Sequence, residues 1–224
     1  MEFFDWEKDG GHRLVGALYF RLFDVIDKEV RTWEFWSAKK NKSAGHLHLE
    51  NFTIYAKPSL LQIIEKGLKI NTMVGIDFTA SNWDADVPGS NHYQNPDKFT
   101  YNQYQQAIHS VVSILSLYDY HKQIPCYGFG AKCRYPELYT TDCSHLFPLS
   151  GNSNATTAMN VDGVFGLYNY AIENIIFSGP TYFAPLIKSA MAQAIRLAQI
   201  DPSNYTVLLI LTDGVIDDMT QTID

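Results

Sequence analysis

The second part of the chain alternates two hydrophobic patterns. Apolar runs of strand length cover residues 70–78, 124–129, 145–149 and 205–211. Apolar residues recur at spacings of three and four, which predicts helices, over residues 99–118, 162–177 and 183–200. Strands that alternate with helices usually form a mainly parallel sheet. We therefore expect an α/β domain over residues 69–224.

The first part of the chain follows a different pattern. Short aromatic runs, separated by turns rich in Gly, Asp and Lys, predict strands at residues 14–23, 32–36 and 46–55. Three such strands cannot close a sandwich, so residues 1–56 look like the last part of a larger all-β domain. Pro58 interrupts this pattern, and residues 59–66 then predict a short helix that ends at Gly67. We interpret residues 57–68 as a linker.

Composition narrows the classes of function. The chain has 224 residues, 46% of them hydrophobic and 18% charged, which is typical of a globular protein. Its formal net charge of -7 argues against a nucleic-acid partner. An acidic protein that reaches an anionic membrane needs a local basic patch or a bridging cation. The acidic N-terminus lacks a signal-peptide pattern, and the three cysteines lack metal-like spacing. We therefore expect a cytoplasmic protein with reduced thiols.

Side chains that carry oxygen follow the ends of predicted strands. In VGIDFTASN, a strand ends in Asp77, and Thr79 and Ser81 follow at alternate positions. The turn SGPT presents Thr181 before a helix, and the strand of LILTDG ends close to Asp213. In open α/β sheets, ligands bind at the edge where the carboxyl ends of the strands lie. We therefore expect these five side chains to converge.

Two carboxylates and three hydroxyls make a set of oxygen ligands. Such a set suits a small hard cation that keeps some of its water, such as Mg²⁺, and argues against zinc and copper. Because the ligands carry little negative charge, the ion would accept an acidic side chain from a partner. Each segment alone has a simpler interpretation as a helix cap or a turn. The three segments in this order are much more specific.

The same segments resemble the copine family. VGIDFTASN, PCYGFG, SGPTYFAPLI and LLILTDGVI are similar to the copine-type von Willebrand A domain, over about residues 60–218. The resemblance implies a Rossmann-like, mainly parallel sheet with helices on both faces. It also implies a metal ion-dependent adhesion site for Mg²⁺ or Mn²⁺, formed by Asp77, Thr79, Ser81, Thr181 and Asp213. Copines characteristically carry threonine at the second of these positions.

The segment FDWEKDGGHRLVG resembles the calcium loop of a C2 domain. Asp5 and Asp9 stand where acids are expected, and Glu7 replaces an aspartate with a longer carboxylate. The resemblance therefore implies Ca²⁺ binding by these three residues, on the C-terminal part of a second C2 domain. Arg13 replaces a further acid with a cation, which should repel calcium. A polar hairpin turn without calcium is the alternative interpretation.

The resemblance implies a binding protein without catalytic activity. Copines are cytosolic proteins with two C2 domains followed by an A domain. We therefore expect a calcium-dependent phospholipid-binding adaptor that is recruited to the plasma membrane. Its C2 domains would bind anionic phospholipid, and its A-domain metal would bind a protein partner that offers an acidic side chain. The sequence has neither a nucleophile elbow nor a phosphate-binding loop. The alternatives are an A-domain ubiquitin ligase relative without its RING, and a metal-dependent hydrolase.

Other features have a plain structural interpretation. We expect a solvated loop, rather than a contact with lipid headgroups, at Lys39, Lys40 and Lys42. We expect three tryptophans in the core of the β domain: Trp6, Trp33 and Trp36. Trp83 directly follows the VGIDFTASN segment and could line the rim of the metal site.

The ends of the chain carry a further expectation. If the sequence is complete as written, it begins inside a C2 domain and ends early in an A domain. In the strand order 3-2-1-4-5-6, the strand at residues 205–211 would lie between two neighbours. Here it would become a bare apolar edge, so we expect poor solubility or association of the isolated chain.

Overall fold

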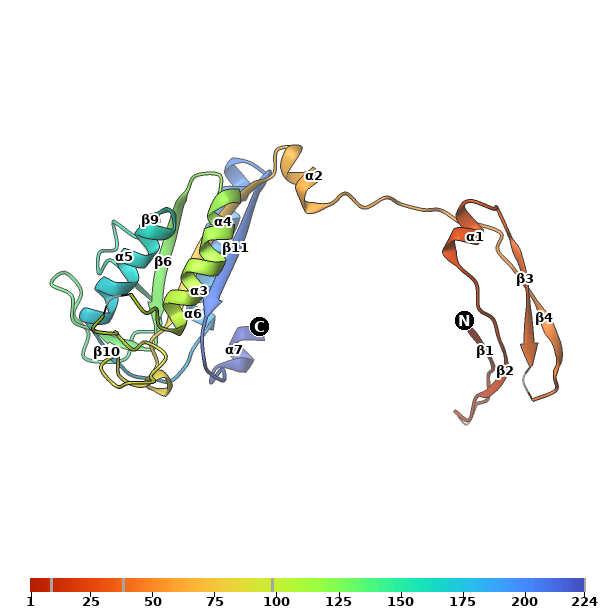
Figure 1. Cartoon of the computed structure of the whole chain (residues 1–224), viewed down its shortest axis with the longest axis horizontal. Helices are drawn as coiled ribbons and strands as arrows, with labels where there is room; N and C mark the ends of the chain where they lie inside the picture. Colours follow the sequence, from red (N-terminus) through yellow and green to blue (C-terminus); the bar gives the residue numbers. More distant parts are fainter. Residues whose placement is uncertain (9, 38, 98, 224) are drawn as a thin grey trace. The chain divides into compact units, whose positions relative to one another are not determined.

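The computed structural model describes every residue except 9, 38, 98 and 224. Contacts within the chain separate it into two compact units, Met1–Lys57 and Pro58–Asp224. Figure 1 labels the elements of both. Among the described residues, no helix combines the length and the apolar character that crossing a membrane requires.

The first unit is a four-stranded antiparallel sheet with the strand order β1-β2-β3-β4. Its elements are β1 (Glu2–Asp5), β2 (Arg13–Ala17), α1 (Leu22–Ile26), β3 (Thr32–Ser37) and β4 (Lys42–His48). β3 and β4 pair along most of their length, whereas the pair of β2 and β3 among the described residues is Ala17 with Trp36. Gly16 still lies against β3, because a Cβ atom added there would be 2.8 Å from the carbonyl oxygen of Trp36.

Two strand predictions in this unit are partly wrong. β2 covers only the first part of the strand predicted at residues 14–23, and α1 begins at Leu22, near the end of that run. There, Asp24 forms ion pairs with Arg21 and Lys28, three and four residues away, which is the spacing of helix neighbours. β4 ends early in the strand predicted at residues 46–55. The assignment of this unit to a C2 domain stays a prediction.

The tryptophans of this unit also differ from expectation. Trp6 is 72% exposed and Trp36 is 52% exposed, so neither belongs to a core of the first unit. Trp33 is half-buried and packs its ring against Phe20 at 5.0 Å. A sheet of short strands has too little interior to enclose three indole rings.

The second unit is a mixed α/β structure. Its main sheet has the order β11-β5-β6-β8, with β9 also paired to β6, and β10 pairs with β7 in a small separate sheet. β11, β5 and β6 are parallel, whereas β8 and β9 run antiparallel to β6. The strands are β5 (Lys69–Asp77), β6 (Gln123–Phe129), β7 (Ala131–Cys133), β8 (Phe147–Pro148), β9 (Thr157–Met159), β10 (Ile175–Phe177) and β11 (Asn204–Leu211). The helices are α2 (Leu60–Glu65), η1 (Ala80–Asn82), α3 (Gln103–Ala107), η2 (Ile108–Val112), α4 (Ser113–Tyr118), α5 (Asn160–Glu173), α6 (Ala184–Ile200) and α7 (Met219–Ile223).

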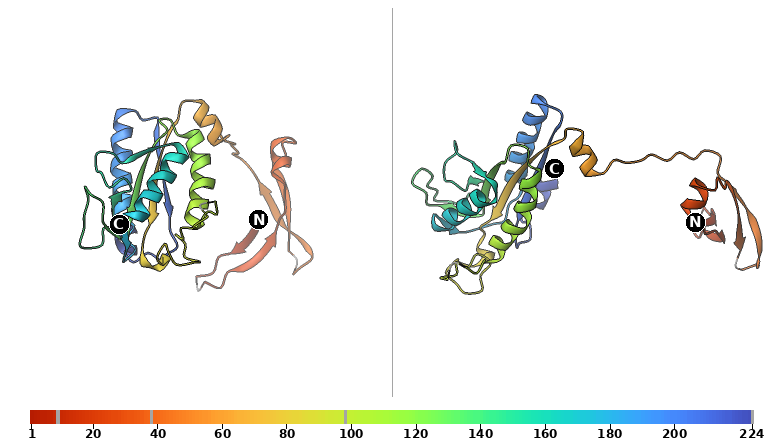
Figure 2. Two further views of the ribbon diagram at one scale, coloured as in Figure 1. Left: turned by 60° about the vertical axis from the view of Figure 1, so that its left-hand side comes forward. Right: turned by 45° about the horizontal axis from the view of Figure 1, so that its top comes forward.

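Alternate residues of β5 serve two cores. Val74 and Ile76 belong to a cluster of buried residues that includes side chains of α3, η2 and α5. Gly75 meets the other core, because a Cβ atom added there would lie 2.2 Å from a methyl carbon of Leu186 in α6. Leu186 packs with Phe129 in this second cluster. Figure 2 shows the strands between α6 and the continuous helix formed by α3, η2 and α4. These findings confirm the α/β prediction.

The sequence pattern predicts that these helices form better than it predicts the residues at which they begin and end. The helix expected from residue 99 begins at Gln103, because Asn102 and Gln105 form a reciprocal capping box there. The helix expected to run to residue 177 ends at Glu173, and β10 follows it. The apolar run at residues 205–211 forms β11, which lies at one end of the described sheet order.

Candidate metal site

The register of the parallel sheet brings two strand ends together. β11 and β5 are aligned so that Leu211 lies opposite Ile76, which makes Thr212 and Asp77 neighbours at the carboxyl edge. The hydroxyl of Thr212 donates a hydrogen bond of 2.6 Å to Oδ2 of Asp77. Asp77 therefore lies at the carboxyl edge of the sheet, as the strand pattern predicted.

Four of the five predicted residues form one hydrogen-bonded chain. Oδ1 of Asp77 accepts from the backbone N–H of Thr79 at 2.8 Å and from its hydroxyl at 2.6 Å. The hydroxyl oxygens of Thr79 and Ser81 lie 2.9 Å apart, and Ser81 donates to Oδ1 of Asp213 at 3.1 Å. When each hydroxyl gives its single hydrogen to its carboxylate, none remains for the contact between the two oxygens. Their lone pairs then face each other, which a cation would stabilise.

Thr181, the fifth predicted residue, lies beside this chain. The backbone N–H of Thr181 donates to Oδ2 of Asp217 at 2.8 Å. The carbonyl of Thr181 accepts a hydrogen bond of 2.9 Å from the backbone N–H of Asp217. A Cβ atom on Gly214 would lie 3.5 Å from Oγ1 of Thr181 and 3.7 Å from Oδ2 of Asp77. Both oxygens thus border the same small space, and Thr181 joins the group by proximity.

The buried carboxylate of Asp77 makes this arrangement fit a cation. Asp77 is fully buried, and its burial raises the pKa of the carboxyl, against hydrogen bonds from Thr212 and Thr79 that lower it. The nearby charge of Asp213 raises this pKa further. Among the described residues, no ion pair involves either carboxylate. A buried charge without a partner is costly, so a bound cation would stabilise Asp77 in its ionised form.

The donor set is unusual for a metal site in its share of hydroxyls. Within the described part of the chain, no three His, Cys, Asp or Glu side chains gather in a way that could hold a metal ion. The five predicted residues offer two carboxylates and three hydroxyls. A small hard cation with water among its ligands is the metal that such a set suits.

Two residues that position the site were not predicted. The side-chain amide of Asn91 donates to Oδ2 of Asp213 and to Oδ1 of Asn82, both at 3.1 Å. The ring of His92 bonds through Nε2 to the carbonyl oxygen of Asp77 at 2.8 Å. Both residues lie in the loop after η1, which has no periodic pattern that could have identified them. Thr212, by contrast, is part of the LILTDG segment.

His92 holds the backbone of Asp77 as a neutral ring. A carbonyl only accepts hydrogen bonds, so Nε2 carries the hydrogen, and Nδ1 lies 2.8 Å from the hydroxyl of Tyr168. Burial lowers the pKa of His92 to about 3. The ring also stacks on Tyr104 with centroids 3.9 Å apart. The core thus fixes the strand end that carries the site.

The comparisons with known proteins concern the family to which this chain belongs. The copine family model matches residues 90–224. The chain belongs to the copine family. It is 35% identical over 228 residues to Copine-A of Dictyostelium discoideum, which covers all of this chain and 37% of that protein. It is 34% identical over 234 residues to Protein BONZAI 2 of Arabidopsis thaliana, covering all of this chain and 39% of that protein. The chain therefore spans about two fifths of the length of these relatives.

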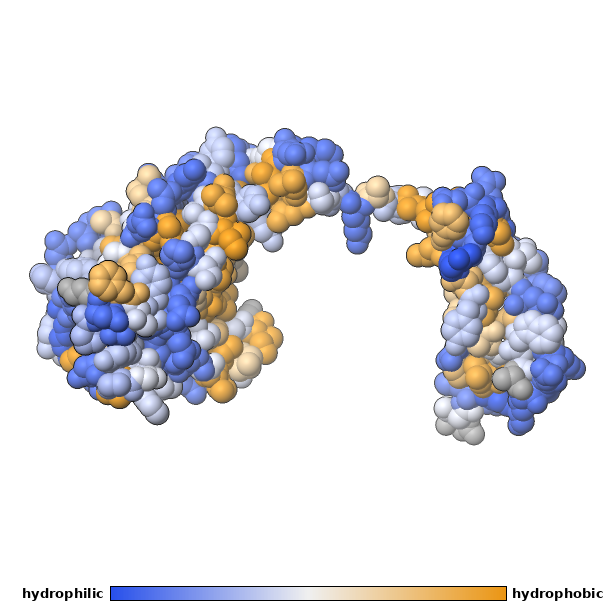
Figure 3. Space-filling view, in the orientation of Figure 1, coloured by the Kyte–Doolittle hydropathy of each residue, from blue (hydrophilic) through white to orange (hydrophobic). Residues whose placement is uncertain are grey.

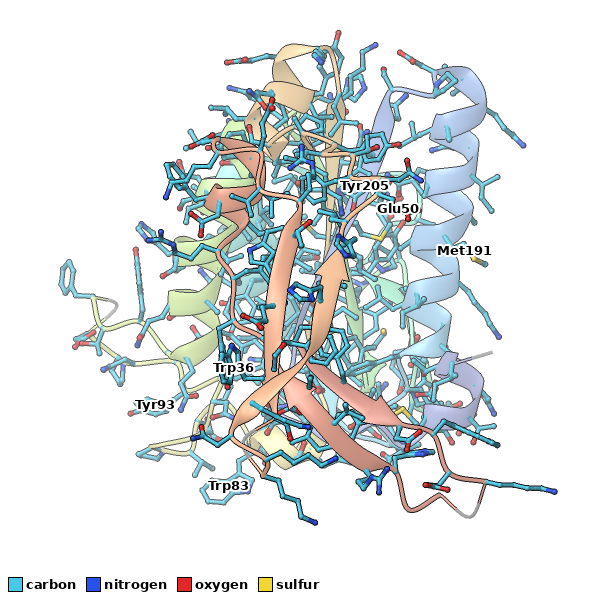
Figure 4. The ribbon with its side chains drawn as sticks, turned by 90° about the vertical axis from the view of Figure 1, so that its right-hand side faces the viewer. Trp36, Glu50, Trp83, Tyr93, Met191 and Tyr205 are labelled. Atoms are coloured by element: carbon cyan, nitrogen blue, oxygen red, sulfur yellow. The ribbon has the colours of Figure 1, made fainter. Side chains whose placement is uncertain are left out.

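Trp83 of this copine chain follows the segment that carries Asp77, Thr79 and Ser81. It directly follows η1 with φ 64° and ψ 164°, a backbone conformation that is largely restricted to glycine. Its side chain is 63% exposed, and Figure 4 shows it projecting outward. A strained backbone and an exposed indole two residues after Ser81 are consistent with a role at the rim of the site, which the sequence left open.

The proposed calcium loop in the first unit of the copine chain carries a competing cation. Oδ2 of Asp5 accepts a hydrogen bond of 2.9 Å from the guanidinium of Arg13. The backbone N–H of Glu7 donates to Nδ1 of His12 at 3.2 Å. Asp9, the third residue of the predicted calcium site, lies outside the described residues. Asp5 is thus already paired with a positive charge, and calcium binding stays a prediction.

Proposed function

We propose that this copine chain is a metal-dependent binding module and not an enzyme. Residues 69–224 serve as a copine-type von Willebrand A domain with a metal ion-dependent adhesion site. Mg²⁺ or Mn²⁺ binds to Asp77, Thr79, Ser81, Thr181 and Asp213. The observation that carries the proposal is the hydrogen-bonded chain from Asp77 through Thr79 and Ser81 to Asp213.

The bound ion would supply an electrophilic position for an acidic side chain of a protein partner. The five side chains supply five oxygen ligands when each binds once, which leaves one position open in the octahedral shell that Mg²⁺ prefers. Asp213 lies toward the surface and Asp77 is buried, so the two hold the ion between the core and the solvent. A carboxylate of the partner would complete the ligand set. Affinity for the partner would then depend on the metal.

The contacts of His92 argue against the alternative of a metal-dependent hydrolase. His92 is the histidine bonded to Asp77, and both of its ring nitrogens have partners in the core. It is fully buried, and its low pKa keeps it neutral. It therefore cannot take a proton from a water molecule at the metal, as a general base would.

The first unit extends the proposal to membranes. Residues 1–56 serve as the C-terminal part of a C2 domain, and the full-length form binds anionic phospholipid when calcium rises. The protein would be cytoplasmic and would move to the plasma membrane in a calcium-dependent way. Support comes from the relatives, two of which are named copines, and from the resemblance of the β1–β2 loop to a C2 calcium loop.

Titration with Mn²⁺ tests the metal site. We expect Asp77→Ala to weaken Mn²⁺ binding at least about tenfold in calorimetry. The change removes the buried carboxylate from the hydrogen-bonded set of proposed ligands. Asp162→Ala is the matched control: it removes one exposed acid in the first turn of α5, which follows β9 at the opposite edge of the sheet. Circular dichroism checks that both variants fold. Equal Mn²⁺ affinity in the two variants would refute the site.

A further inference from the structure

A basic pocket lies in the first unit, apart from the candidate metal site. It encloses about 350 Å³ between β2 and the β3–β4 hairpin. No acid is found among the described residues that line it. Four are cations, and two more carry hydroxyls: Arg13, Lys39, Lys40, Lys42, Ser37 and Ser43. Cations and hydroxyls together are the donors that bind a phosphate group.

The pocket is bordered by two segments of the same sheet. Arg13, Leu14 and Val15 of β2 lie on one side, and residues of the β3–β4 hairpin from Ser37 to Ala44 lie on the other. Among the described residues, Ala17 and Trp36 form the pair that joins β2 to β3. The sheet thus brings cations from two separate segments to one pocket.

The charge of this pocket is opposite to that of the whole chain. The chain has a net charge of -7, yet three lysines gather on the β3–β4 hairpin. Among the described residues, no ion pair involves Lys39, Lys40 or Lys42. Arg13, the fourth cation of the pocket, is paired with Asp5 at the end of β1, so the three lysines are the cations without an ion pair there. The three lysines thus keep their charge available for an anion.

Exposed apolar side chains lie at the same end of the unit. Trp6 directly follows β1 and is 72% exposed, and Leu14 of the pocket lining is 49% exposed. Figure 3 shows hydrophobic and hydrophilic residues side by side on the visible face of this unit. Exposed indole rings combined with lysines are typical of surfaces that lie in the interface of a membrane. This combination favours a lipid headgroup over a free phosphate ion.

We propose that this pocket binds the phosphate of an anionic phospholipid headgroup directly, without calcium. It would give the chain a basal attraction to anionic membranes that adds to any calcium-dependent contact of the C2 loop and is independent of the metal site of the second unit. The interaction is electrostatic, so it weakens as salt increases. Loss of each lysine is expected to weaken binding about fivefold.

Vesicle binding of the whole chain in the presence of EGTA tests the proposal. The probes are phosphatidylcholine vesicles with and without phosphatidylserine. The pocket variant combines Lys39→Gln, Lys40→Gln and Lys42→Gln. The control combines Lys66→Gln, Lys188→Gln and Arg196→Gln, which removes the same charge from exposed positions of the second unit. We expect the wild type and the control to bind the phosphatidylserine vesicles, and the pocket variant to bind about a hundredfold more weakly.

Three outcomes would overturn the proposal. The wild type may not be retained by phosphatidylserine vesicles in EGTA, the control variant may lose binding as much as the pocket variant, or inorganic phosphate may bind the pocket without any vesicle binding. The last result would assign the pocket to a free anion instead of a membrane. Calorimetry with Mn²⁺ is expected to be the same for both variants, so failure here is distinct from failure of the metal site.

Discussion

At the scale of single residues, Gly130 allows Thr79 of the candidate site to take its position. It follows β6 with φ 79°, in the left-handed region that favours glycine. Its N–H donates to the carbonyl of Ser144, and its carbonyl accepts from the N–H of Ser178. A Cβ atom here would lie 2.2 Å from Cγ2 of Thr79 and 3.1 Å from its backbone nitrogen. The absence of a side chain is what lets Thr79 approach.

We expect Gly130→Ala to lower the free energy of unfolding by more than about 1 kcal/mol and to weaken Mn²⁺ binding. The methyl group requires a disfavoured φ and displaces Thr79. Gly166→Ala is the matched control, because Gly166 is exposed within α5 and an added Cβ would meet nothing within 4 Å. We expect Gly166→Ala to raise the free energy of unfolding by about 0.5–1 kcal/mol. Denaturant unfolding and Mn²⁺ calorimetry measure both, and similar effects of the two changes would contradict the role of Gly130.

The residues of the candidate site were predictable only where strand pattern and motif coincide. Asp77 and Asp213 could be predicted because each follows an apolar strand, and parallel strands end at one edge. His92 and Asn91 could not, because they reach the site from an irregular loop through contacts with residues far away in the sequence. Nothing in the local sequence around His92 and Asn91 marks them, and only the folded structure brings them to the site.

At the scale of elements, the segment after β11 holds the start of α6. Asp218 accepts hydrogen bonds from the backbone N–H groups of Phe183 at 3.0 Å and Ala184 at 2.9 Å. Burial alone would raise the pKa of Asp218, but these bonds outweigh it and the pKa lies below its ordinary value. Asp217 pairs in the same way with the backbone of Thr181. The strand end that carries Asp213 and the turn that carries Thr181 are thus joined.

We expect Asp218→Ala to lower the free energy of unfolding by about 1–3 kcal/mol, because two buried N–H groups lose their acceptor. Asp162→Ala, which removes an exposed acid from the first turn of α5, should change it by less than about 1 kcal/mol. A carboxyl with a lowered pKa stabilises the fold above its ordinary pKa, and this contribution is lost as pH falls through the lowered value. The difference in free energy of unfolding between the wild type and Asp218→Ala should therefore become smaller in acid. A constant gap in denaturant unfolding across this range would contradict the cap.

Helices and central strands were predicted well because their patterns are long. The helix that contains α6 repeats its apolar residues over several turns, and β11 is almost entirely apolar. Where local charge pairs decide, the pattern fails: α1 is held by the pairs of Asp24 with Arg21 and Lys28, in a run that resembles a strand. The capping of α6 by Asp218 is equally invisible in sequence, because its partner lies more than thirty residues away.

At the scale of the whole molecule, the change of pattern near Pro58 matches a change in architecture. An antiparallel sheet precedes it and a mixed α/β unit follows it. The first unit buries few of its aromatic side chains, so its sequence constrains its strands only weakly. The second unit has two cores on the two faces of one sheet, and its sequence constrains each strand from both sides. The elements of the second unit are therefore predicted better from the sequence than those of the first unit.

Two separate compact units predict two separate unfolding transitions, of which metal should shift only one. A ligand that binds only the folded state stabilises it by about 2.7 kcal/mol at a hundredfold excess over its dissociation constant. Mn²⁺ should therefore raise the stability of the second unit alone, EDTA should reverse the shift, and Asp77→Ala should abolish it. Trp83 is the one tryptophan of the second unit, whereas the first unit has three. Fluorescence of a Trp83→Phe variant consequently follows the first unit, and circular dichroism follows both. A shift of the fluorescence transition by Mn²⁺ would show that the ion binds elsewhere.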